Sequence, residues 1–164
     1  MNKAVFLDRD GTINEGTPYY VHKIEHFFFN EGVFDACKLF LENGFKIIVI
    51  TNQGVIAKGM YNKHDVNELH EYMLQKFDEQ GIEITDIFFC PHHSDYENCL
   101  CRKPEPLMLQ RAMAQYNIDP KCSWFIGDHK RDYDAGIRAG VNAIKIEMND
   151  NLMNHVERIL SHCP

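Results

Sequence analysis

The sequence lacks a long hydrophobic run, and its first residues do not combine a basic segment with an apolar one. No apolar stretch approaches the roughly 20 residues that a membrane-spanning helix needs, so we expect no membrane contact. Without a recognisable secretion signal, the chain is predicted to be cytoplasmic. These two absences favour a protein of the aqueous cell interior.

Positive charge is also scarce, since 17 Lys and Arg stand against 24 Asp and Glu, for a net charge of −7. Nucleic-acid-binding proteins usually present a basic face or an aromatic track, so we expect no nucleic-acid partner. The sequence contains no internal repeat, low-complexity segment or Pro/Gly-rich linker. Its 164 residues are therefore predicted to form a single domain, 1–164, long enough for a substantial core.

Short apolar runs alternate with segments of helical periodicity. The apolar runs predict strands at residues 4–7, 46–50, 87–89, 124–126 and 143–146. The periodic segments predict helices at residues 32–43, 64–80, 105–116, 133–139 and 151–160. This alternation is typical of an α/β fold with a doubly wound, mainly parallel sheet.

Polar residues follow three of the predicted strands. Asp8 and Asp10 follow the first, Thr51 the second and Asp128 the fourth, and the fold would gather them in one crevice at the carboxyl edge of the sheet. Two carboxylates can divide a reaction between a nucleophile and a proton carrier, and carboxylates are ligands that Mg²⁺ prefers. Taken singly, each residue could equally belong to a solvated turn or a helix cap. Asp132 fits either a cap or a partner that orients a metal ligand.

Three of the six cysteines fall within twelve residues, in the pattern Cys90-Pro-His92-His93, five residues, then Cys99-Leu-Cys101. Three thiolates and one imidazole form a common tetrahedral zinc set, so residues 90–103 are predicted to form a zinc-stabilised loop. The close Cys-x-His spacing favours His92 as the fourth ligand, and His93 remains the alternative. The other cysteines carry no metal signal, and no disulfide framework is expected.

Together these motifs resemble the haloacid dehalogenase (HAD) superfamily of phosphotransferases, whose pattern occurs here in order as Asp8–Thr12, Thr51, Lys103 and Gly127–Asp132. From about Lys3 to Ile146 the chain further resembles the heptose 1,7-bisphosphate phosphatases. The segments that carry this likeness are VFLDRDGTIN at 5–14, YVH at 20–22, TNQ at 51–53, CPHH at 90–93 and CRKP at 101–104. Histidinol-phosphate phosphatases are a sister family and give the alternative function.

The chain departs from the heptose family at three points. Gly54 stands where Ser is common, His129 stands where Lys is common, and residues 15–19 form a segment one residue longer than usual. Because these positions border the substrate in that family, they bear on which substrate is used and leave the chemistry unaffected.

The resemblance implies a cytoplasmic, monomeric enzyme without a large cap domain, which removes the 7-phosphate of a small phosphorylated sugar in nucleotide-activated heptose biosynthesis. Asp8 would be the nucleophile and Asp10 the general acid and base, with Thr51 and Lys103 stabilising the phosphoryl group. Mg²⁺ would be held by Asp8, Asp10 and Asp128, and structural Zn²⁺ by Cys90, His92, Cys99 and Cys101. The implied substrate-binding residues, among which Arg102 would hold the second phosphate, are Arg9, Thr17, Pro18, Tyr19, Tyr20, Asn52, Gln53, Gly54, Arg102 and His129.

Overall fold

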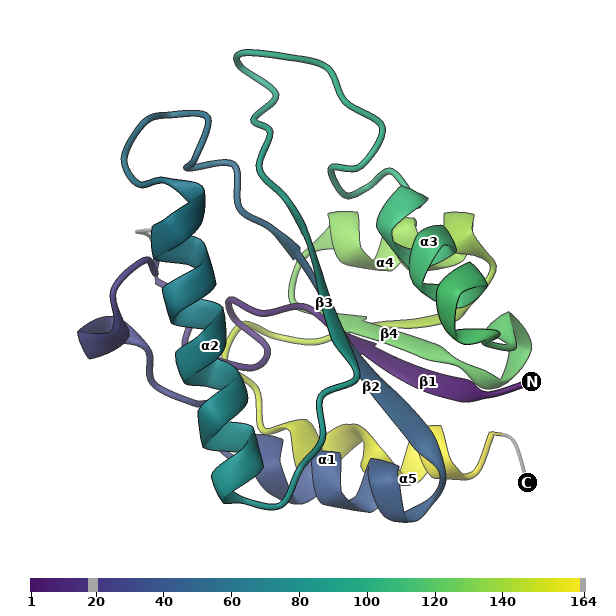
Figure 1. Ribbon diagram of the computed structural model, residues 1–164. Coiled ribbons are helices and arrows are strands. Elements are labelled where there is room, and N and C mark those ends of the chain that lie inside the picture. The colour runs from purple at the N-terminus through teal and green to yellow at the C-terminus, as the bar shows by residue number, and fades with distance from the viewer. Residues whose placement is uncertain (18–20, 163–164) are drawn as a thin grey trace.

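The computed structural model describes residues 1–17 and 21–162, which form an α/β fold around a five-stranded parallel sheet (Figure 1). The strand order is β3-β2-β1-β4-β5, and every pairing is parallel. The strands are β1 (Lys3–Leu7), β2 (Phe45–Asn52), β3 (Asp86–Cys90), β4 (Trp124–Gly127) and β5 (Asn142–Lys145). The predicted fold class is confirmed.

Helices cover both faces of the sheet. They are α1 (Val33–Glu42), α2 (Lys63–Glu79), α3 (Leu107–Tyr116), α4 (Lys130–Ala139) and α5 (Val156–Leu160), with 3₁₀ turns at Ile24–His26, Pro120–Cys122 and Leu152–His155. Apolar side chains of α1, α2 and α5 pack on one face, and those of α3 and α4 pack on the other. No helix in the described part of the chain is long and apolar enough to cross a bilayer.

The central strand β1 shows why this sequence forms a doubly wound sheet. Val5 and Leu7 belong to one core cluster, whereas Ala4 and Phe6 belong to the other, and all four side chains are fully buried. A strand that is apolar on both faces must be covered on both sides, as parallel strands in α/β proteins are. The short apolar run at 4–7 thereby places the residue that follows it, Asp8, at the carboxyl edge.

The order of the strands creates a crevice at that edge. The chain winds from β1 to β2 and β3 in one direction, and then returns to β4 and β5 on the other side of β1. Ligands in such folds bind at the point where the winding reverses. Asp8 follows β1 there, and its backbone N–H donates to the carbonyl of Ile126 in β4 at 2.9 Å. Beyond β3, residues 91–106 form a long loop that projects past this edge (Figure 1).

The boundaries differ from the expected ones at two positions that matter for the site. Strand β2 continues through Thr51 and Asn52, because both pair with β3, so Thr51 lies within the strand and not after it. Helix α4 begins at Lys130 and not at 133, because the Asp132 carboxylate accepts from the His129 backbone N–H at 2.9 Å and caps the first turn.

Candidate active site

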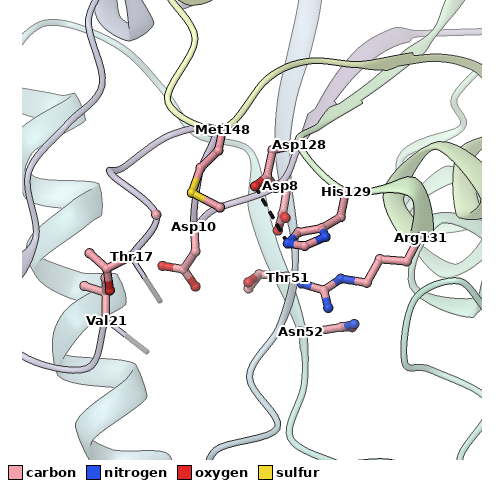
Figure 2. A pocket seen from close by; sticks show the side chains of 11 residues that line it. Asp8, Asp10, Thr17, Val21, Thr51, Asn52, Asp128, His129, Arg131 and Met148 are labelled. Atoms are coloured by element: carbon pink, nitrogen blue, oxygen red, sulfur yellow. Dashed lines mark ion pairs between the residues drawn. The ribbon is translucent and has the colours of Figure 1, made fainter. Parts of the chain in front are cut away.

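A cavity of about 240 Å³ opens at the carboxyl edge of the sheet (Figure 2). It brings together residues from the segment that follows β1, the carboxyl end of β2, the β4–α4 junction and the segment that follows β5. Its lining residues are Asp8, Asp10, Gly16, Thr17, Val21, Thr51, Asn52, Asp128, His129, Arg131 and Met148. Most of these were predicted from the sequence. Pro18, Tyr19 and Tyr20, also predicted to bind substrate, lie outside the described residues.

Asp8 lies buried in the cavity and pairs with a buried lysine. Lys103 Nζ contacts Asp8 Oδ1 at 2.7 Å and Asp132 Oδ1 at 2.8 Å, and it donates to the Ile50 carbonyl at 2.9 Å. Burial, then the charge of Asp132, raises the pKa of Asp8 to about 7, against the opposing effect of Lys103. For Lys103, burial alone would lower the pKa, but the two carboxylates outweigh it and raise the pKa above its usual value.

Asp132 takes one of the two roles that the sequence left open for it, the helix cap, and also contacts Lys103. Its Oδ1 lies beside Lys103 Nζ, and its Oδ2 caps helix α4 at His129. Only glycine fits at position 127, because a Cβ there would lie 2.4 Å from the Asp132 Cβ. The side chain is fully buried, so Asp132 holds Lys103 in place from behind the cavity.

Three carboxylates gather in a way that suits a cation. Asp8, Asp128 and Asp132 each offer an oxygen, and these oxygens all lie within 4.8 Å of one another. Asp128 Oδ1 is buried without a hydrogen-bond partner among the described residues, and burial raises the pKa of Asp128. Gly11 at φ +84 makes room for this carboxylate, since a Cβ there would lie 2.4 Å from Asp128 Oδ2. Because Lys103 supplies a single positive charge, the cluster fits a bound divalent metal ion.

Asp10 is held from several sides. Arg9 Nη2 donates to its two carboxylate oxygens at 3.0 and 2.9 Å, Asn14 Nδ2 donates at 3.0 Å, and Gln53 Nε2 donates at 3.1 Å. About a third of the Asp10 side chain remains exposed, at 32%. The carboxylate therefore has a fixed direction and still borders the open part of the cavity.

Arg9 was predicted to bind substrate, but it is fully buried and does not line the cavity. Its guanidinium contacts Asp10, the Val21 carbonyl at 2.9 Å and His70 Nε2 at 3.2 Å. Burial, and then the charge of Arg9, lowers the pKa of His70 to about 3, so this imidazole is neutral and accepts from the guanidinium. We therefore assign Arg9 the task of holding Asp10.

Gln53 and Asn52 were also predicted to bind substrate, and the structure gives their side chains protein partners. Gln53 is buried, and its amide donates to Thr51 Oγ1 at 2.9 Å as well as to Asp10. Thr51 Oγ1 accepts this bond and keeps its own O–H for the cavity. Asn52 lines the cavity, but its amide bonds both the N–H and the carbonyl of Lys103, at 3.0 and 3.2 Å. These amides tie the carboxyl end of β2 to Asp10 and to Lys103.

The predicted cysteine and histidine ligands meet at one point. Cys90 Sγ lies 3.7 Å from Cys99 Sγ and 3.2 Å from Cys101 Sγ, and His92 Nδ1 lies 3.5 and 3.2 Å from the sulfurs of Cys90 and Cys101. Four donors around one tetrahedral zinc would stand about 3.5 Å apart. His93 instead accepts from the Asp95 N–H through its Nδ1. The geometry therefore favours His92 over His93 in a metal-binding cluster.

The loop that carries this cluster also carries Arg102 and packs against Gly54. Arg102 Nη1 donates to the His92 carbonyl at 3.0 Å, and Arg102 does not line the cavity. A Cβ at position 54 would lie 2.8 Å from Arg102 Nη1 and 2.8 Å from the His92 carbonyl oxygen. The glycine therefore permits close packing of the loop and the arginine.

Sequence reasoning missed four lining residues, Gly16, Val21, Arg131 and Met148. Arg131 is the chemically important one, and its place within the Gly127–Asp132 motif was the signal that could have found it. Outside the site, Cys122 is disulfide-bonded, whereas the sequence carried no obvious signal at this residue.

Comparison with known proteins points to the same family that the sequence motifs resemble. Residues 100–151 match a family model described as HAD-hydrolase-like. A curated relative from Campylobacter jejuni, named D-glycero-alpha-D-manno-heptose-1,7-bisphosphate 7-phosphatase, is 44% identical over 87% of this chain and 80% of its own length. The chain belongs to the heptose-1,7-bisphosphate 7-phosphatase family. It is therefore a HAD-type phosphoric monoester hydrolase.

Other members of the heptose phosphatase family support the assignment. A Yersinia pestis protein, named for the beta anomer of the same bisphosphate, is 42% identical over 84% of this chain and 76% of its own length. Among solved structures, the D,D-heptose 1,7-bisphosphate phosphatase of B. bronchiseptica, complexed with magnesium and phosphate, has a TM-score of 0.84 and 27% identity over 97% of this chain and 86% of that one.

Proposed function

We propose that this protein removes the 7-phosphate from D-glycero-D-manno-heptose 1,7-bisphosphate by way of a phosphorylated Asp8. The observation that carries the proposal is the floor of the cavity, where a buried Asp8 touches Lys103 while Asp10 borders the open space beside it. The names of the relatives support the substrate, and they include both anomers of the bisphosphate.

In the first step, an Asp8 carboxylate oxygen attacks the phosphorus of the 7-phosphate, and the bond from phosphorus to the sugar oxygen breaks. Asp10, in its protonated form, gives a proton to the departing oxygen. Lys103 Nζ and the free O–H of Thr51 stabilise the negative charge on the phosphoryl oxygens. Arg9, Asn14 and Gln53 hold Asp10 in the direction that this proton transfer needs.

In the second step, water attacks the phosphorus of phosphorylated Asp8, and the bond from phosphorus to the Asp8 oxygen breaks. Asp10, now ionised, accepts a proton from that water. Inorganic phosphate leaves, and both carboxyl groups return to their starting forms. Asp10 thus acts once as an acid and once as a base, which suits a side chain that is fixed in direction and partly open to solvent.

The buried carboxylates fit the magnesium ion that the family implies. Asp8 and Asp128 would hold it together with the backbone carbonyl of Asp10, and the unpartnered Asp128 Oδ1 supports this donor set. When bound, the ion would offset the repulsion between the Asp8 carboxylate and an incoming phosphate dianion. Asp132 would stay with Lys103, since one of its oxygens contacts Nζ and the other caps α4.

The Cys90, His92, Cys99 and Cys101 cluster fits a structural zinc ion, because its four protein donors would leave no open position for a substrate. The ion would fix a loop that is poor in apolar side chains, and so would position Arg102 and Lys103, which follow Cys101 directly. Arg102 would still bind the second phosphate. Only its Nη1 has a hydrogen-bond partner in the described chain, so its other guanidinium nitrogens are available to that phosphate. Thr17 and His129, at the rim of the cavity, would contact the sugar.

The test is steady-state phosphate release in the presence of Mg²⁺. Both anomers of heptose 1,7-bisphosphate are compared with histidinol phosphate, and the Asp8→Asn variant gives the background. We expect one bisphosphate to exceed histidinol phosphate at least about 100-fold in kcat/KM, which is roughly 2.7 kcal/mol of transition-state discrimination. A preference for histidinol phosphate would contradict the proposed substrate and leave the roles of Asp8 and Asp10 intact.

A further inference from the structure

Arg131 lies in the first turn of α4, and its guanidinium reaches into the cavity (Figure 2). Its sequence neighbours point elsewhere, since Asp132 pairs with the buried Lys103 and Lys130 pairs with Asp134 on the exposed side of the helix. Among the cavity-lining residues, Arg131 alone carries a permanent positive charge.

This guanidinium has no partner among the residues that the structure describes. Its Nε is buried without a hydrogen bond, and the group forms no ion pair with Asp8 or Asp128. It lines the same cavity as both carboxylates, and its charge partly opposes the rise in their pKa that burial causes. Arg9 and Lys103, the two buried cations of the site, are each bonded to three protein groups.

An unpaired donor that is shielded from water costs about 1–3 kcal/mol, so native proteins usually satisfy such groups. The exceptions often acquire their hydrogen-bond partner only when a ligand binds. A guanidinium presents its N–H groups as a planar fork, and this fork matches two oxygens of one phosphate. A bound phosphate would supply the hydrogen-bond acceptor that the described protein residues do not provide.

We propose that Arg131 binds the phosphate that the reaction leaves on the sugar, and thereby helps to select a bisphosphate. This inference rests on the proposed function, because it requires a substrate with two phosphates. The transferred phosphate belongs at Asp8, where Lys103 Nζ and Thr51 already serve it. Because Arg131 is not paired with Asp8 or Asp128, its fork remains available to a second anion in the same cavity.

Arg131 would share this phosphate with Arg102 in an unequal way. Arg102 is tied to the His92 carbonyl and lies outside the lining of the cavity, whereas Arg131 is inside it and untied. We therefore expect the larger part of the preference for a bisphosphate to depend on Arg131.

The test compares Arg131→Gln with the unchanged protein on heptose 1,7-bisphosphate and on heptose 7-phosphate, which lacks the retained phosphate. Hydrogen bonds to charged groups contribute about 1.5–3 kcal/mol, so KM for the bisphosphate should rise roughly 10- to 100-fold, with kcat changed by less than about threefold. The kinetic constants for heptose 7-phosphate should not change. The product heptose 1-phosphate, which carries only the retained phosphate, should bind more weakly as an inhibitor by the same factor.

Lys130→Gln is the matched control, because it removes the same charge one residue away from an exposed side chain and should alter neither substrate. Arg131→Lys should recover part of the affinity, and it serves as the test variant if Arg131→Gln does not fold. An equal loss on both substrates would overturn the assignment to the retained phosphate, and so would an unchanged KM for the bisphosphate. If the unchanged protein rejects heptose bisphosphates, the proposed function itself fails, before any variant is compared.

Discussion

The buried contact between Asp132 and Lys103 gives a prediction whose size follows from the structure. In Asp132→Ala, Lys103 loses one of two carboxylates but keeps Asp8 at 2.7 Å and the Ile50 carbonyl at 2.9 Å, so the lysine is not left unpaired. The variant also loses the cap of α4 at the His129 N–H. A hydrogen bond to a charged group contributes about 1.5–3 kcal/mol and a cap about 1 kcal/mol.

Part of this loss of stability is offset, because removing Asp132 also removes its repulsion with Asp8 across the same lysine. We therefore expect Asp132→Ala to lower the free energy of unfolding by about 2–4 kcal/mol. Asp132→Asn can still cap α4 through its amide oxygen, so its cost should be smaller by about 1 kcal/mol. Phosphate release should fall in both variants, since Lys103 would lose one of the two carboxylates that fix its position beside Asp8.

Urea unfolding followed by circular dichroism measures these differences, with the metal content held equal. Asp134→Ala is the matched control, because Asp134 lies in the same helix and pairs with the exposed Lys130, a contact that contributes only about 0.3–0.5 kcal/mol. If Asp132→Ala cost no more than Asp134→Ala, the assignment of Asp132 as the residue that holds Lys103 would be refuted.

Further variants test other parts of the site. Asp8→Asn should reduce phosphate release to background while leaving the fold unchanged, and appreciable residual turnover would exclude Asp8 as the nucleophile. His70 is neutral in the native state, with its pKa lowered from 6.5 to about 3, so the unfolded chain binds a proton that the native state lacks and stability falls as the pH falls below about 6.5. His70→Gln should flatten that decline in urea unfolding at pH 7 and pH 5, and an unchanged slope would contradict the neutral imidazole. Cys99→Ser should lower both the zinc content, measured by elemental analysis, and the midpoint of thermal unfolding; full zinc occupancy would refute the ligand assignment. Gly54→Ala should cost about 1–3 kcal/mol and raise KM, because its Cβ would meet Arg102 and the loop backbone, and a KM like that of the unchanged protein would argue against this packing.

The sequence predicts most of the fold because the apolar runs are short and are bounded by turn residues. Each predicted strand is present, and the residues after the first, second and fourth strands meet at one edge as the parallel arrangement requires. The boundary at Thr51 was less predictable. Two polar residues at the end of an apolar run resemble the start of a loop, and only pairing with β3 keeps them in the strand.

The directions of the side chains were harder to predict than their positions. Gln53 follows β2 in a polar segment that suits a substrate contact, yet its amide is used within the protein by Thr51 and Asp10. Residues 128–132 resemble a solvated charge cluster in sequence. In the fold, Lys130 is in solvent, Asp132 is fully buried and Arg131 faces the cavity. The helical turn that separates these three directions begins at Lys130, three residues before the start that the apolar pattern predicts.

The cations of this site therefore differ by their partners more than by their type. Arg9 and Lys103 are each satisfied by protein groups, and so their charges serve to hold Asp10 and Asp8 in position. Arg131 has no such partner in the described chain, and so its charge remains for a ligand. The resemblance implied that Arg9 binds substrate and did not include Arg131, and residue type alone does not distinguish these two arginines. The number of unsatisfied donors that face the cavity is the property that separates a residue which shapes the site from one which binds the substrate.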